Sequence, residues 1–186
     1  MIEWINQADQ NILQWIYQNL HNPFSDFIMR LFTGLGDWGF LWIIISVILL
    51  CKKKYRPFGV LLLLVLACNL IVGEIVIKNL IARARPFINR EDIILLIQRP
   101  SGYSFPSSHA SSSFAAAFIL TKVNKKLAWF YLPSFLIAFS RIFLYVHHPS
   151  DILAGIFLGT LLAWLVYLPF NSLYLHAKKV HKTSIS

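Results

Sequence analysis

Charged residues are scarce in this chain. Asp, Glu, Lys and Arg make up only 13% of its 186 residues, hydrophobic residues make up 57%, and the mean hydropathy is +0.61. Several apolar runs approach or exceed the ~18–20 residues that are needed to cross a bilayer. The sequence therefore predicts an integral membrane protein of the all-α class, built as a helical bundle.

The sequence also lacks features that would indicate a domain boundary or a cleavable targeting peptide. No Gly/Ser linker, internal repeat or low-complexity tract interrupts the chain. We therefore expect one domain over 1–186, with an amphipathic N-terminal segment (1–30), a transmembrane core (31–172) and a basic cytoplasmic tail (173–186). The start MIEWINQADQ has no basic stretch, which argues against a cleavable signal peptide. The two cysteines lie in or beside apolar runs as small hydrophobic residues and do not indicate a redox compartment.

Basic residues outnumber acidic ones by 17 to 8, which gives a net charge of +9. Such a balance can indicate a nucleic-acid partner, but ten of the basic residues lie in three clusters beside apolar runs. The clusters are Lys52, Lys53, Lys54 and Arg56, then Lys122, Lys125 and Lys126, and finally Lys178, Lys179 and Lys182. This pattern follows the positive-inside rule. We therefore expect the clusters in the cytoplasm, membrane lipids as partners and no nucleic acid.

Residues 3–20 have apolar side chains at helical spacing, namely Ile5, Ala8, Ile12, Trp15, Ile16 and Leu20. This pattern predicts an amphipathic helix in the membrane interface, packed against lipid or against the bundle. Five spans are predicted after it, at 38–51, 57–77, 107–121, 127–146 and 150–170. Residues 78–106 and 147–150 are then extracytoplasmic and the C-terminus cytoplasmic. If the N-terminal helix also crosses, there are six spans and the outer loops are unchanged.

The outer residues 101–113, SGYSFPSSHASSS, read as a loop that becomes the start of a helix. Pro106 suits a first helical turn, and Ser104 or Ser107 can cap the free N–H groups. The N-terminus of a helix attracts anions, because its N–H groups and its dipole both face the ligand. His109 follows one turn inside.

Several further charges need a reason to lie in spans or outer loops. Arg141 falls within the fourth span, where an unpaired cation is costly, so a paired or functional role is expected. Lys78 ends the second span one turn after Glu74, which predicts an ion pair or a snorkelling lysine. His147 and Asp151 are at i and i+4, so the carboxylate can hold one imidazole nitrogen and leave the other free.

Together these groups predict a site for a phosphate ester at the outer face. Cations and N–H groups would hold the phosphoryl oxygens, one histidine would attack phosphorus, and the other would protonate the leaving oxygen. The sequence has no carboxylate cluster of the kind that binds magnesium, since the outer acids Glu91 and Asp92 are adjacent. We therefore expect a reaction without metal or other cofactor.

Three segments resemble the signature motifs of the type 2 phosphatidic acid phosphatase superfamily. KNLIARARP resembles Lys-x6-Arg-Pro, PSSH resembles Pro-Ser-Gly-His, and SRIFLYVHHPSD resembles Ser-Arg-x5-His-x3-Asp. The matching residues are Lys78, Arg85 and Pro86; Pro106, Ser107 and His109; and Ser140, Arg141, His147 and Asp151. Ser108 stands where the family usually has glycine, a departure that we expect to tune activity without abolishing it.

The resemblance implies a role for each of these residues. His147 would be the nucleophile that forms a phosphohistidine, Asp151 would orient it, and His109 would be the general acid. The motif spacing selects His147 over His148. The residues that would bind phosphate are Lys78, Arg85, Ser107, Ser108 and Arg141.

A lipid phosphate is the expected substrate, because the site is predicted beside the bilayer. Undecaprenyl pyrophosphate is favoured by resemblance to compact bacterial members of the family, and phosphatidylglycerophosphate and phosphatidic acid are the alternatives. A non-enzymatic transporter or lipid-binding scaffold is a second class of function, in which Arg141 and Glu74 would mark a path. A vanadate-dependent haloperoxidase reaction is a third. Residues 91–97 fit either a lid over the site or an interfacial anchor.

Overall fold

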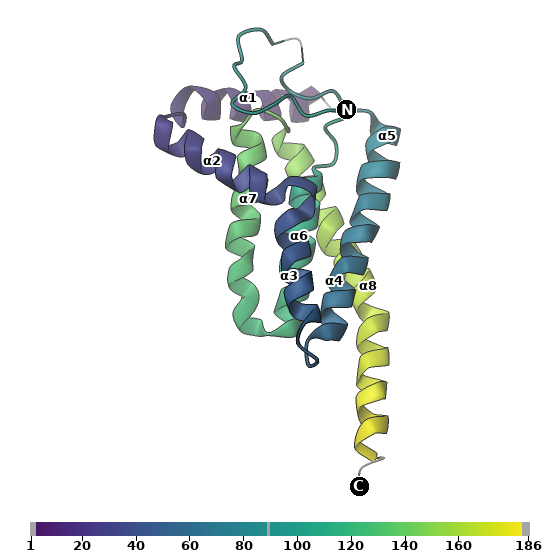
Figure 1. Ribbon diagram of the computed structural model, residues 1–186. Coiled ribbons are helices and arrows are strands. Elements are labelled where there is room, and N and C mark those ends of the chain that lie inside the picture. Colours follow the sequence, from purple (N-terminus) through teal and green to yellow (C-terminus); the bar gives the residue numbers. More distant parts are fainter. Residues whose placement is uncertain (1–2, 89, 184–186) are drawn as a thin grey trace.

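The structure is a computed structural model that describes residues 3–88 and 90–183, with side chains described up to residue 176. Figure 1 shows an all-helical bundle, and no strand occurs in these two ranges. Upright helices run side by side: α3 (Phe40–Leu50), α4 (Arg56–Asn69), α6 (Ser108–Val123), α7 (Tyr131–Phe143) and α8 (Pro149–Thr183). The predicted all-α fold is confirmed.

Helix α6 forms the centre of the bundle and packs against α4, α7 and α8. Its contact with α8 is close because small residues meet there. A Cβ added to Gly155 or Gly159 would lie 2.5 Å from the Ser107 carbonyl oxygen or 2.0 Å from that of Ser111, respectively. The small residues of the third predicted span therefore support close helix packing.

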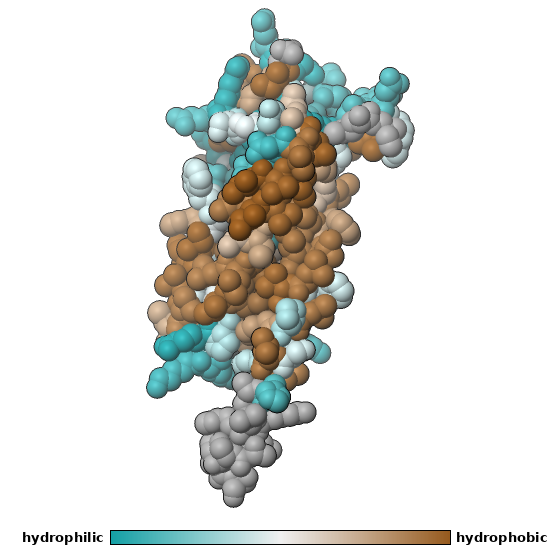
Figure 2. Space-filling view, turned by 90° about the vertical axis from the view of Figure 1, so that its right-hand side faces the viewer, coloured by the Kyte–Doolittle hydropathy of each residue, from teal (hydrophilic) through white to brown (hydrophobic). Residues whose placement is uncertain are grey.

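Within the described ranges, three helical stretches are long and apolar enough to cross a bilayer: Pro23–Leu50, Arg56–Ile81 and Pro149–His176. The second stretch continues from α4 through a π-helical segment, Leu70–Ile77, into α5 (Lys78–Ile81). A hydrophobic band covers the face in Figure 2 between hydrophilic residues near both ends. These features support an integral membrane helical fold, and the count of five spans stays a prediction.

The observed helices differ from the first and fourth predicted spans in where they begin and end. Helix α2 (Pro23–Gly36) lies across the top of the bundle in Figure 1 and bends into α3 at a short 3-10 turn, Asp37–Gly39. The bend arises because Trp38 and Gly39 have φ of 55° and 69°. The fourth predicted span ran to 146, but α7 ends at Phe143, preceded by the 3-10 segment Lys125–Phe130.

Helix α1 (Glu3–Asn19) lies across the same end of the bundle and contacts α7 and α8. The predicted amphipathic helix is thus present. Asp9, Leu13 and Ile16 are buried, whereas Ile12 and Trp15 are exposed. Asp9 is buried because its tertiary partners cover it, although hydrophobic periodicity assigns this acidic residue to the polar side of the helix.

The predicted outer loops gather at the end that carries α1 (Figure 1). Residues 91–97 form turns and irregular chain there rather than a helix, with Ile93 buried and the Ile94 N–H donating to the Tyr17 hydroxyl at 3.1 Å. At the opposite end, Lys53, Lys54 and Lys122 line one small pocket, so the first two basic clusters share a face. The side chains of Lys178, Lys179 and Lys182 lie outside the described ones.

Candidate active site

A cavity of about 930 Å³ lies at the end of the bundle that carries the outer loops. Six of the eight predicted site residues line it, namely Lys78, Arg85, Ser108, His109, Arg141 and His147. They come from α5, the loop after it, α6, α7 and the turn before α8. The other two predicted residues, Ser107 and Asp151, are fully buried and are not among the lining residues.

The start of α6 forms one wall of this cavity. Ser107 is the N-cap, and its hydroxyl accepts from the Ala110 N–H at 3.5 Å. Pro106 precedes the cap, so its predicted place in the first helical turn is wrong, and Ser104 does not cap the helix. The Ser107 N–H donates to the Asp151 carbonyl at 3.1 Å. Ser107 thereby ties the start of α6 to the start of α8.

His147 lies in the turn between α7 and α8 and is only 2% exposed. Its Nδ1 is 3.6 Å from Oδ2 of Asp151, and its Nε2 is 3.3 Å from Nη1 of Arg85. The first distance exceeds an ordinary hydrogen bond. Asp151 thus stands behind the imidazole, while Nε2 is on the side of Arg85, which lines the cavity.

Burial lowers the pKa of His147 well below its usual value, and the cations of Arg141 and Arg85 act in the same direction against Asp151. The imidazole is therefore neutral at neutral pH and keeps a lone pair for nucleophilic attack. The neighbouring His148 turns its Nε2 to the Ala84 carbonyl at 3.4 Å and does not line the cavity.

Two arginines are held beside His147 in different ways. Arg85 donates to three backbone carbonyls, those of Gly102, Val146 and Ser101, at 2.9–3.0 Å, which fixes its guanidinium. Arg141 is 4% exposed and donates from Nη1 to the Thr33 hydroxyl. Its buried Nε has no hydrogen-bond partner in the described part of the chain. An unpaired buried donor on a cavity wall is a group that an anionic ligand can satisfy.

His109 is held by the bend between α2 and α3. Its Nε2 lies 3.0 Å from Oδ1 of Asp37, so the carboxylate orients the imidazole ring. Gly36 makes room for the ring, since a Cβ there would lie 2.6 Å from His109 Cδ2 and 2.6 Å from Ile137 Cγ2. Neither Gly36 nor Asp37 was predicted. The only sequence signal was the glycine-containing run GLGDWG before an apolar stretch.

Comparison with known proteins identifies the family. Residues 58–173 match the sequence model of the PAP2 superfamily, over a stretch that includes all three motifs. The chain belongs to the PAP2 superfamily.

Individual relatives agree with this assignment. A lipid A 4'-phosphatase from Bacteroides thetaiotaomicron is 29% identical, over 90% of this chain and 79% of that protein. An undecaprenyl-diphosphatase from Sulfolobus acidocaldarius is 32% identical, over 73% of this chain and 67% of that protein. The structure of a PAP2 type phosphatidylglycerolphosphate phosphatase from Bacillus subtilis has a TM-score of 0.72 and 27% identity, covering 89% of this chain and 86% of that one. The chain is therefore a membrane lipid phosphatase.

The residue that replaces the usual PAP2 glycine has its own partners. The Ser108 hydroxyl donates to Oε2 of Glu74, and Nζ of Lys78 lies 2.6 Å from the same oxygen and 3.3 Å from the Ser108 hydroxyl. The expected Glu74–Lys78 ion pair is confirmed. All three residues line the cavity, so a phosphate bound at Lys78 would share the ammonium group with a carboxylate of like charge.

We therefore predict that Glu74→Gln lowers KM for a lipid phosphate by roughly three- to tenfold with little change in kcat. Removing a partly exposed like charge is worth about 1 kcal/mol. Steady-state kinetics on the purified enzyme measure both constants. Glu91→Gln, the same change at an exposed acid of the outer loop, is the control. An increase in KM would mean that Glu74 supports Lys78 instead of competing with phosphate.

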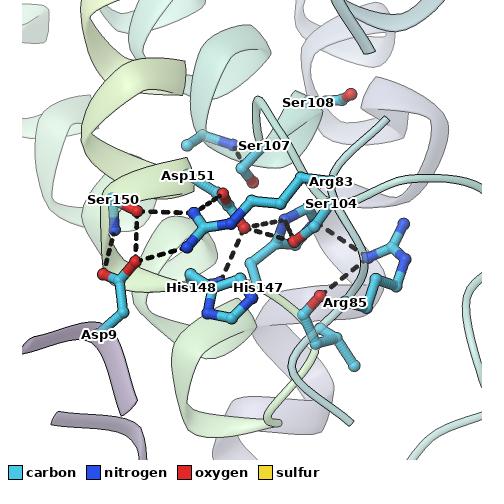
Figure 3. A network of polar contacts seen from close by, with 12 residues as sticks. Asp9, Arg83, Arg85, Ser104, Ser107, Ser108, His147, His148, Ser150 and Asp151 are labelled. Carbon is cyan, nitrogen blue, oxygen red and sulfur yellow. Dashed lines mark hydrogen bonds and ion pairs between the residues drawn. The ribbon is translucent and has the colours of Figure 1, made fainter. Parts of the chain in front are cut away.

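Sequence reasoning also missed the residues that surround Asp151. Arg83 is a basic residue of the predicted outer loop to which no sequence pattern assigned a role. In the structure it contacts Asp151 and Asp9, and Ser104 donates to Asp151 Oδ2 (Figure 3). Arg83 lies two residues before the motif arginine Arg85, which was the available signal. Asp9 had none, because nothing in the local sequence brings α1 to α8.

Proposed function

We propose that this PAP2 lipid phosphatase hydrolyses undecaprenyl pyrophosphate to undecaprenyl phosphate through a phosphohistidine at His147. The observation that carries the proposal is the cavity in which two histidines meet the three predicted phosphate-binding cations. The cavity is continuous with the apolar side chains of Ile43, Leu63 and Leu66 on α3 and α4. A phosphate group fits the polar part, and a prenyl chain fits the apolar wall. The similarity to an undecaprenyl-diphosphatase supports this choice of lipid.

In the first step, Nε2 of His147 attacks the terminal phosphorus while the bond to the leaving oxygen breaks. His109 donates its proton to that oxygen, so the lipid departs as the protonated product. Asp151 stabilises the positive charge that develops on the His147 ring. Lys78, Arg85 and Arg141 neutralise the phosphoryl oxygens, which is the main requirement of a phosphoryl-transfer transition state.

In the second step, water attacks the phosphohistidine. His109, now neutral, accepts a proton from that water, and the bond between Nε2 and phosphorus breaks to release inorganic phosphate. The two steps return both histidines to their starting states. Because three cations supply the charge that a metal ion would otherwise provide, the proposal includes no metal.

The test is phosphate release by the purified protein from undecaprenyl pyrophosphate, phosphatidylglycerophosphate and phosphatidic acid, measured in micelles with a chelator present. We expect kcat/KM to be at least about tenfold higher for undecaprenyl pyrophosphate, a difference of ~1.4 kcal/mol in transition-state binding. A preference for a glycerophospholipid would show that the proposed substrate is wrong, while the proposed reaction would still hold. Release from none of the three would contradict the site as a whole.

We further propose that the active site faces the extracytoplasmic side and that the C-terminus is cytoplasmic. The basic clusters of the loops after α3 and α6 support this orientation, since they share the opposite end of the bundle. In a variant lacking Cys51 and Cys68, a cysteine introduced at Arg90 should react with an impermeant reagent added to intact cells, and one at Asn124 should not. Labelling at position 124 but not at position 90 would show that the topology is the reverse of the proposed one.

A further inference from the structure

A buried polar network connects helix α1 to the carboxylate behind His147. Figure 3 shows Arg83 lying between two carboxylates, Asp9 of α1 and Asp151 at the start of α8. The side chains of Arg83, Asp9 and Asp151 are 8%, 4% and 0% exposed. Ion pairs with so little solvent access are weakly screened, so each charge acts strongly on the others.

Arg83 holds both carboxylates with different nitrogens. Its Nη1 donates to Asp151 Oδ1 at 2.6 Å and to the Ser150 hydroxyl at 2.7 Å. Its Nη2 donates to Asp9 Oδ2 at 2.8 Å and to Asn6 Oδ1 at 3.0 Å. Because a guanidinium is planar and rigid, these bonds fix the position of Asp151 relative to α1.

Asp9 also binds the first turn of α8 directly. Its Oδ1 accepts from the Ser150 N–H at 2.9 Å, and its Oδ2 accepts from the Ser150 hydroxyl. A carboxylate that accepts N–H bonds at a helix start is favourably placed. Helix α1 is therefore joined to the residue immediately before Asp151 as well as to Arg83.

The two oxygens of Asp151 have separate partners. Oδ1 faces Arg83, while Oδ2 accepts from the His148 N–H at 2.8 Å and from Ser104, and lies nearest His147. Arg83 thus sets the rotation that turns Oδ2 toward the nucleophile. A lone cation at Oδ1 would, however, neutralise the charge that must stabilise His147 once its ring becomes positive. Asp9 supplies a second negative charge on the far side of Arg83.

We propose that Asp9 is a positioning residue for catalysis: it holds Arg83 against Asp151 and offsets the arginine charge, so that Asp151 can stabilise the phosphorylated, positively charged His147. The inference rests on the proposed role of His147 as nucleophile. It makes the N-terminal amphipathic helix a part of the catalytic apparatus, since α1 supplies the charge that completes the network. A purely structural tie between α1 and α8 would affect stability without affecting turnover.

The test compares Asp9→Asn with the wild-type enzyme in the full-length protein, after loss of activity in His147→Ala has established the reaction. Asparagine has nearly the same shape as aspartate but no charge. We expect kcat to fall roughly 10- to 100-fold, by analogy with the loss when the partners that orient metal-binding histidines are removed, with KM within about twofold. Glu3→Gln, an exposed acid in the same helix, is the matched control and should keep wild-type kcat.

A double-mutant cycle with Arg83→Gln separates the charge network from a tie between helices. Because Asp9 acts through Arg83, the loss in the double variant should be clearly smaller than the product of the two single losses. Losses that multiply would overturn the proposal, as would an Asp9→Asn enzyme with wild-type kcat or with a change in KM or melting temperature alone. If Asp9→Asn does not fold, Arg83→Lys serves instead: loss of kcat alone supports the proposal, and wild-type kcat overturns it.

Discussion

Replacing His147 by alanine should abolish lipid phosphate release, with kcat/KM reduced by at least about 10⁴-fold, the scale of loss when a covalent nucleophile is removed. Within the described ranges, His147 is the only histidine that lies beside Asp151 and also lines the cavity. The remaining cations would still bind the phosphate. We therefore expect a loss of turnover much larger than any change in affinity, measured as inorganic phosphate released from undecaprenyl pyrophosphate.

The adjacent histidine provides the control for that result. His148→Ala removes an imidazole from the same turn, but that ring faces the Ala84 carbonyl. We expect it to keep activity within roughly tenfold of wild type, the effect of losing one weak hydrogen bond of about 1 kcal/mol. Equal losses in the two variants would indicate disruption of the turn. Substantial activity in a folded His147→Ala enzyme would refute the nucleophile assignment.

Replacing His109 by alanine should reduce turnover by roughly 10²- to 10⁴-fold, and the loss should depend on the leaving group. Phosphatidic acid releases an alkoxide, which needs a proton from a general acid. Undecaprenyl pyrophosphate releases a phosphate, which is a much better leaving group. We therefore predict a larger loss for phosphatidic acid than for the pyrophosphate, and the smallest loss for an activated aryl phosphate.

Asp37→Asn provides a graded comparison for that experiment. It removes the charge beside His109 Nε2 but leaves the imidazole in place, so its losses should follow the same order of substrates and be smaller. Kinetic constants on the three substrates give the comparison. A His109→Ala loss that is equal for all three would show that His109 binds or positions the phosphate and does not donate the proton.

The sequence was sufficient for the parts of the site that depend on local geometry. The i, i+4 spacing of His147 and Asp151 placed them on one side of a helix start. Preferences at helix N-termini narrowed the cap of α6 to Ser104 or Ser107. The hydrophobic runs predicted the helices of the core. An apolar segment in lipid must satisfy its own backbone N–H and C=O groups, and a helix does so. Arg141 was informative because charged side chains within a membrane span are rare and costly.

The parts that depend on tertiary contacts could not be predicted in this way. Asp9 interrupts no local rule, and it is buried only because Arg83 and Ser150, 74 and 141 residues away, supply its partners. Hydrophobic periodicity therefore placed Asp9 on the polar side of α1 and could not predict its burial. Likewise, Asp37 reaches His109 only because Trp38 and Gly39 bend the chain with positive φ values. A bend of this kind does not change the hydrophobicity pattern of the sequence, so the pattern could not predict it.

The central claim is that a lipid phosphate transfers its phosphoryl group to His147. The most direct measurement is mass spectrometry of enzyme denatured at alkaline pH during turnover, since phosphohistidine is lost in acid. We predict one phosphoryl group on His147 in the wild-type enzyme and none in His147→Ala. A phosphoryl group on His109, or on any residue other than His147, would contradict the account.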